Sequence, residues 1–197
     1  MAEPEISASL VTVGKPVDGG CAWTNFNDEV TFPTGATDKM STMTGWESCG
    51  EVSTNGFTES RSVSATDLKG WHNTTLITSI DDETNTFKVE FVEVNRATAA
   101  KLRYGADAVT VDADGNVTNI AQKPYDGVAR PLVFDELESN GWLRRTVFKK
   151  AVISSFDDVP HQRGSLMVYG MTFTVNDPGD GSSPIEIFRA KPSAPKA

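Results

Sequence analysis

The sequence predicts a mainly β protein: an antiparallel β-sandwich or barrel with one short flanking α-helix, at about residues 95–105, and a long early loop. Three observations predict this fold class. Apolar and polar residues alternate with a period of two, turn-forming sequences separate the alternating segments, and a single helical pattern occurs among them. With 197 residues, the chain is expected to form one β domain over residues 1–197.

Strands are expected wherever the alternation is clear. In TFKVEFVEV at residues 86–94, Phe87, Val89 and Phe91 occupy one face and the charged residues occupy the other. The other expected strands are residues 6–13, 57–63, 74–80, 131–136, 143–154 and 167–175. Turn sequences lie at residues 54–56, 112–116, 140–141 and 177–181. The acidic run at residues 81–83 is expected to be a solvated hairpin tip.

One short helix is expected between strands. Asn95 can cap its start, residues 96–104 carry the helical pattern, and Gly105 is placed to end it with a left-handed conformation. A helix of this length is marginal alone. It is therefore expected to pack on a sheet.

Two segments do not fit a strand pattern. Residues 24–45 are rich in Thr and contain Pro33, and a connection of this length is usually functional or disordered. Two interpretations of this segment stay open. It is either an arm that becomes ordered against a neighbouring subunit, or a flexible loop with a small hairpin at residues 29–32. Residues 190–197 are expected to form a flexible C-terminal tail.

Composition and motifs argue against several function classes. The net charge is 18 − 27 = −9, with scattered basic residues, which argues against gripping nucleic acid through phosphates. No membrane-spanning apolar run and no secretory signal are seen. No catalytic motif occurs, and the two histidines, His72 and His161, are too few for a His cluster. Catalytic residues, cofactors and an enzymatic activity are therefore not expected.

A metal site is not expected either. Cys21 and Cys49 are too few for a four-thiolate site and are expected to be free thiols. The turn at residues 112–116 imitates a calcium loop, but Val117 and Lys123 stand where that loop needs Gly and Glu.

The order of several motifs resembles a known family. The chain carries WESCGEV at 46–52, NGF at 55–57, DLKGW at 67–71, FVE at 91–93 and a helix closed by YG at 104–105, followed by GWLRR at 141–145, FKKA at 148–151 and DDVP at 157–160. In this order they resemble the major tail (tail tube) proteins of long-tailed bacteriophages, over about residues 46–190. The shared single-domain pattern points to the non-contractile type.

The resemblance implies a structural virion protein, made in the host cytoplasm. In such proteins six copies close into a ring, and rings stack around the tape-measure protein into a tube through which the genome leaves. The implied partners are other copies of the chain, the tape-measure, tail terminator and distal tail proteins, and double-stranded DNA in passage only, without sequence specificity and without a membrane. The alternative is a carbohydrate- or receptor-binding β-sandwich module of a virion.

The resemblance also assigns residues to roles. Residues 24–45 become the inter-subunit arm, with Phe32, Pro33, Thr34, Met40 and Met43 as contacts. Trp46, Trp71 and Trp142 are expected at packing or interface positions. Because an anionic bore repels phosphate, acidic residues are expected to face the lumen. The candidates are Glu59, Asp81, Asp82, Glu83, Glu90 and Glu93. Exposed sheet edges are expected to be completed by neighbouring copies.

Overall fold

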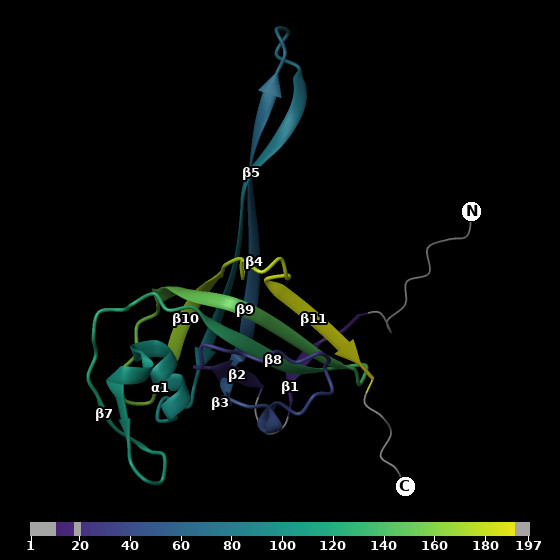
Figure 1. The fold of residues 1–197 in the computed structure, drawn as a ribbon. Coiled ribbons are helices and arrows are strands. Elements are labelled where there is room, and N and C mark those ends of the chain that lie inside the picture. The colour runs from purple at the N-terminus through teal and green to yellow at the C-terminus, as the bar shows by residue number, and fades with distance from the viewer. Residues whose placement is uncertain (1–10, 18–20, 192–197) are drawn as a thin grey trace.

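The structure is a computed structural model that describes residues 11–17 and 21–191 (Figure 1). It confirms a mainly β fold with one α-helix. Nine antiparallel strands form one sheet, and two more form a small separate sheet. The large sheet contains β1 (Gly14–Pro16), β2 (Ala22–Asn25), β3 (Trp46–Gly50), β4 (Val52–Lys69), β5 (Thr75–Phe91), β8 (Arg130–Glu138), β9 (Leu143–Phe156), β10 (Tyr169–Val175) and β11 (Ile185–Ala190).

The large sheet runs in the order β3-β2-β8-β9-β10-β5-β4 and forks at two places. Beside β8 lie β2, which pairs along Leu132–Phe134, and β1, which pairs further along the strand. Beside β9 lie β10 along its second half and β11 along its first half. The sheet is therefore open, with edges at several strands, and it is not the closed barrel that the sequence allowed.

Aromatic side chains fill the inner face of the curled sheet. Phe57 on β4 stacks on Phe134 of β8 with ring centroids 4.3 Å apart. Phe87 on β5 stacks between Phe148 and Phe173 at 4.0 and 4.7 Å. The Phe57–Phe134 and Phe87–Phe148 stacks join strands that are not neighbours in the sheet, whereas Phe87 and Phe173 lie on the paired strands β5 and β10. The base of the β4–β5 hairpin is thereby held against β8 and β9 without closing the hydrogen-bonded ladder.

A second apolar cluster covers the opposite face of β8 and β9. Val133 and Val147 alternate with the phenylalanines of the inner face and are fully buried. Met40 and Trp46 pack on them. The segment that supplies Met40, residues 26–45, contains only a short 3-10 helix, η2 (Met40–Thr42). This segment therefore acts as a cover for its own sheet.

The helix α1 (Ala97–Tyr104) forms where the sequence predicts it. Ala99, Ala100 and Leu102 are buried in the main core. The expected cap is wrong, because the capping position is Arg96, which makes no side-chain capping bond. Gly105 ends the helix with φ +95°, and its N–H donates to the Lys101 carbonyl at 2.9 Å. Beyond it, η3 (Ala106–Ala108) leads into a two-stranded hairpin of β6 (Val109–Val111) and β7 (Val117–Ile120).

Most expected strands are present, but several local predictions fail. Most of the two expected strands 74–80 and 86–94 belongs to one continuous strand, β5 (Thr75–Phe91), so the acidic run between them is not a hairpin tip. In the predicted strand 6–13, residues 6–10 lie outside the described residues, and 11–13 form no strand. Residues 29–32 form no hairpin. Of the expected tail, Ala190 ends β11, and 192–197 lie outside the described residues.

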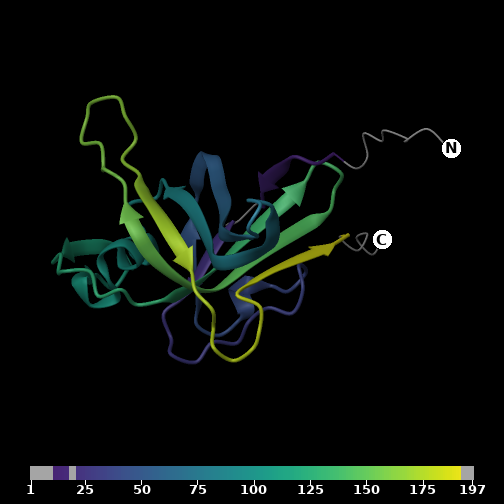
Figure 2. The ribbon, with the colours of Figure 1, turned by 90° about the horizontal axis from the view of Figure 1, so that it is seen from above.

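Viewed from above, the loop between β9 and β10 extends well away from the sheet (Figure 2). His161 lies in this loop and is exposed. Among the described residues, α1 is the only α-helix, and no helix is long and apolar enough to cross a membrane.

Candidate assembly surface

The most prominent feature of the molecule is the β4–β5 hairpin, which projects far beyond the body (Figure 1). Its base contributes Phe87, Val89 and Phe91 to the core. Its outer part, residues 58–69 and 75–83, is exposed to solvent along both strands. At about 3.4 Å per residue, 58–69 span roughly 40 Å. We call this outer part, with its connecting turn, the projecting hairpin.

The projecting hairpin carries a band of exposed apolar side chains. In the strand register, Leu68 lies opposite Ile77, and Val63 and Ile80 follow on the other face. Trp71 in the turn is 99% exposed, and Leu76 next to the turn is 69% exposed. Large apolar side chains gathered on one exposed element mark an interaction site. The band surrounds the hairpin, so a partner could contact it from either face.

The turn at the tip is held in one conformation. The Gly70 N–H donates to the Thr74 carbonyl, and the Asn73 N–H donates to the Gly70 carbonyl, each at 2.9 Å. Asn73 has φ +60°, a left-handed conformation that Asn tolerates better than most residues. The structure therefore presents Trp71 and His72 at the end of an ordered hairpin.

Polar side chains keep the long strands paired in water. Arg61 and Glu83 form an ion pair of 2.8 Å, which lowers the pKa of Glu83. Thr66 donates to Asp81 at 2.5 Å, and β5 bulges there because Ser64 pairs with Asp82 while Ala65 pairs with Ile80. The acidic run can therefore stay within the strand, where the sequence favoured a turn.

The six expected lumen acids do not form one patch. Asp81, Asp82 and Glu83 lie together on the outer half of the hairpin, and Glu59 lies nearer the base. Glu90 accepts a hydrogen bond from Asn55 at the base. The sixth, Glu93, forms an ion pair with Arg96 at the start of α1. Only the group at 81–83 and Glu59 belong to the projecting hairpin.

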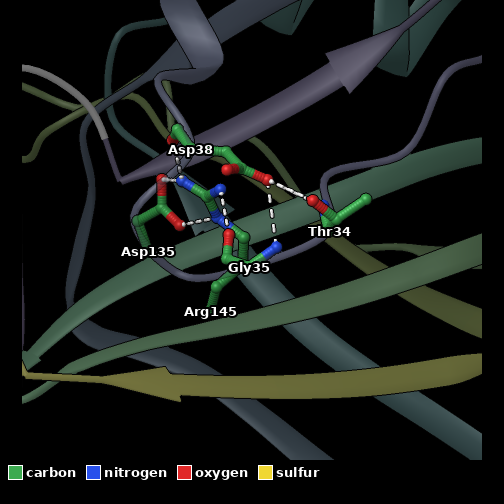
Figure 3. Close-up of polar contacts among 5 residues, drawn as sticks. All are labelled: Thr34, Gly35, Asp38, Asp135 and Arg145. Carbon is green, nitrogen blue, oxygen red and sulfur yellow. Dashed lines mark hydrogen bonds and ion pairs between the residues drawn. The ribbon is translucent and has the colours of Figure 1, made fainter.

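The early loop is anchored to the sheet by a buried arginine (Figure 3). Arg145 on β9 is 3% exposed and forms two hydrogen bonds with Asp135 of β8, at 2.6 and 3.0 Å. Its remaining donors reach the carbonyls of Gly35 and Asp38 at 2.8 and 2.9 Å. One side chain thus joins the ion pair within the sheet to the backbone of the loop that covers it. We call these contacts the Arg145 clamp.

The Asp38 carboxylate organises the same loop from within. It accepts hydrogen bonds from the N–H groups of Thr34 and Gly35 at 2.7 and 3.0 Å. The bond from the Thr34 N–H, the largest effect, and the other hydrogen bonds lower the pKa of Asp38. Because the folded pKa is lowered, the stabilisation is present above the unfolded value of about 3.9 and is lost as the pH falls through the folded pKa.

We therefore expect the Thr34 and Gly35 amide signals to titrate with a midpoint below about pH 3.9 in an NMR pH series. Asp38→Asn should remove this titration while leaving the other amide signals in place. A midpoint at or above the ordinary Asp value would contradict the role assigned to these bonds.

The residues expected at subunit contacts lie in different environments. Pro33 and Met40 are buried within the protomer, Phe32 and Met43 are half-buried against the second apolar cluster, and Thr34 is exposed. Trp46 is buried, and its Nε1–H donates to the Thr31 carbonyl. The other two tryptophans differ from it. Trp71 is fully exposed at the tip, while Trp142 is 37% exposed beneath the Arg189 guanidinium.

A cleft of about 440 Å³ lies at the base of the hairpin. Its walls are the first residues of β4, the strand β1 and part of β8. Gly14, Lys15, Pro16, Cys21, residues 51–57 and residues 134–136 line it. No local pattern in the sequence indicates this cleft, because residues 14–16, 21, 51–57 and 134–136 come together only in the folded chain.

Reactive groups do not gather at any of these places. Cys21 and Cys49 are free and buried, and burial raises the pKa of both thiols. Within residues 11–17 and 21–191, no group of three or more His, Cys, Asp or Glu side chains could hold a metal ion.

Comparisons with known proteins found a matching family and similar solved structures. A family described as phage tail tube protein matches residues 27–192. A solved structure titled as the cryo-EM structure of the anti-feeding prophage (AFP) baseplate, 6-fold symmetrised, is 10% identical, with a TM-score of 0.42 over 95% of this chain and 97% of that chain. No curated protein sequence matches the chain.

Proposed function

The chain belongs to the phage tail tube protein family, a structural component of the virion, and we propose that its copies close into hexameric rings that stack into the conduit for phage DNA. The observation that carries the proposal is the projecting hairpin, whose exposed apolar side chains have no cover in a single copy. The sequence resemblance alone supports the non-contractile type of tail.

Ring closure would use the open edges of the sheet. The outer side of β4 has no partner strand among the described residues, and β3 and β11 are edges elsewhere in the sheet. Such edges expose backbone donors and acceptors that readily pair with another chain. A head-to-tail contact between two different edges of identical copies generates a ring when the rotation closes. The exposed rim of the early loop, which includes Thr34, would add contacts to the neighbouring copy.

The charge of the chain suits a conduit for DNA. Each copy carries −9, so a ring of six would carry 6 × −9 = −54. Carboxylates facing the bore repel phosphate, and DNA then passes without the counterion release that would hold it. We assign this role to Glu59, Asp81, Asp82, Glu83, Glu90 and Glu93. The tape-measure protein inside the tube, with the terminator and distal tail proteins at its ends, completes the proposed set of partners, and no catalytic step is needed.

Electron microscopy of the purified full-length chain tests this function directly. We expect negatively stained rings or tubes whose number increases with chain concentration, because rings and stacks form by association of separate chains. The same preparation should not retain duplex DNA on a filter at low salt, where phosphate contacts would be strongest. The proposal would be contradicted if the chain stays monomeric up to about 1 mM. At that concentration, a contact with a binding free energy of about −4 kcal/mol is half-formed.

A further inference from the structure

We propose that the tip of the projecting hairpin of one copy docks in the cleft at the hairpin base of a second copy, with Trp71 as its anchor. This inference rests on the proposed function and goes further, because it names the surface that receives the hairpin. Three features support it: the position of tip and cleft, the chemistry of the two surfaces and the backbone geometry of the cleft wall.

The tip and the cleft lie at opposite ends of β4. Residues 51–57 line the cleft, whereas the tip begins after Lys69 (Figure 1). A contact between them joins two different surfaces, so it is heterologous, and a docked pair keeps one free tip and one free cleft. Copies displaced along the hairpin direction can therefore repeat the contact without limit. This is the connectivity that stacked rings require.

The two surfaces are chemically complementary. The cleft offers the half-buried apolar side chains of Val52 and Phe57, with the buried ring of Phe134 behind Phe57, and an indole can be buried against them. Its acidic residues are Glu51, Asp135 and Glu136, and Lys15 is its one cationic side chain. Asp135 is already neutralised by the Arg145 clamp.

At the rim, Glu51 is exposed and forms no ion pair with any described residue. The cation next to the tip, Lys69, is likewise exposed and unpaired within the described part of the chain. Docking would bring these opposite charges together while Trp71 fills the apolar floor. Complementary charges of this kind set the orientation of a contact as well as its rate of formation.

The wall of the cleft also has backbone groups to offer. Val52 pairs with Phe91 and Phe57 pairs with Val89, so five steps along β4 match only two along β5. Residues 53–56 consequently bulge out of the ladder and have no strand partner in register. Gly56 has φ +64° with no heavy atom within 4 Å of where a side chain would begin, which leaves room for an incoming turn. Backbone N–H and C=O groups of the tip can therefore form hydrogen bonds with the unpaired backbone of residues 53–56.

Disulfide trapping between two single-cysteine additions tests the docking. We mix full-length His72→Cys, at the tip, with full-length Asn55→Cys, in the cleft wall, under mild oxidation. Both chains also carry Cys21→Ala, because Cys21 lines the same cleft as residue 55. Cys49 is buried with a raised pKa and should stay unreactive. At micromolar chain concentration, we expect His72→Cys and Asn55→Cys chains to form disulfide-linked dimers about a hundredfold faster than His72→Cys and Thr118→Cys chains do. The reason is that docking raises the effective concentration of one thiol near the other to about millimolar. Thr118 on β7 is also exposed, belongs to the separate two-stranded sheet and does not line the cleft.

A charge exchange supplies a second measurement. Lys69→Glu should weaken self-association by up to about fivefold, and adding Glu51→Lys to the same chain should restore it, since tip and cleft come from different copies. Rings or tubes that form without the selective disulfide and without charge rescue would overturn the docking and leave the proposed function standing. An unmodified chain that does not self-associate would overturn both.

Discussion

Trp71→Ala is expected to prevent stacking of the chain while leaving its monomer folded. The side chain is 99% exposed and contacts no core residue, so its loss should change the free energy of unfolding by less than about 0.5 kcal/mol. As the buried anchor of an intermolecular contact, the same indole should contribute about 2 kcal/mol or more at each contact, or roughly a thirtyfold change in the dissociation constant. A tube repeats this loss at every copy.

Sedimentation velocity and electron microscopy measure the effect on assembly, and urea unfolding measures the effect on the fold. Leu166→Ala is the matched control, because Leu166 is 75% exposed but lies in the loop between β9 and β10. This control should assemble like the unmodified chain. Normal tubes from Trp71→Ala would show that the tip is not an anchor, even if the chain proves to be a tube subunit.

Arg145→Met is expected to destabilise the protomer by about 3–5 kcal/mol. The substitution keeps much of the side-chain volume but leaves the Asp135 carboxylate without its cation and the Gly35 and Asp38 carbonyls without their donor. Urea unfolding should show the loss as a lower midpoint with a similar slope. Protease cleavage within residues 34–39 should also become faster, since the loop loses its attachment to β9.

Arg144→Met provides the comparison, because Arg144 is the adjacent residue on the other face and lies 3.6 Å from Glu136. Its half-exposed pair should contribute no more than about 1 kcal/mol. Equal destabilisation by the two substitutions would contradict the special role of the Arg145 clamp. Deleting residues 34–42 is a poorer test of assembly, because it removes the buried Ala36 and Met40 along with any contact to a neighbour.

Prediction from sequence agrees best with the structure where neighbouring residues alone determine the local conformation. The helix at 97–104 forms because a short alanine-rich segment is followed by Gly105. The turn at 112–116 forms because Asp112 accepts hydrogen bonds from the backbone of residues 114 and 116. These features depend on neighbouring residues, so a single sequence contains the information needed to predict them.

The sequence-based predictions fail for segments whose structure depends on contacts with residues far away in the chain. Residues 81–83 are locally typical of a turn, but Arg61 and Thr66 on the opposite strand satisfy their charge and keep them in β5. The early loop is locally irregular, and only the pairing of β8 with β9 places Arg145 and Val147 beneath it. The strand β11 has little local signal and forms because the first half of β9 offers it an edge.

The class of fold can be predicted from the sequence alone, because the two-residue period and the turn chemistry are local properties and suffice to indicate an antiparallel β protein. The tertiary structure decided which element projects and which surface can receive it. Projection depends on burial, because the base of the hairpin stacks on β8 and β9 while its outer part finds no partner within the copy. The burial of a side chain depends on contacts with segments that are distant in the sequence, so it cannot be predicted from the local sequence around that side chain.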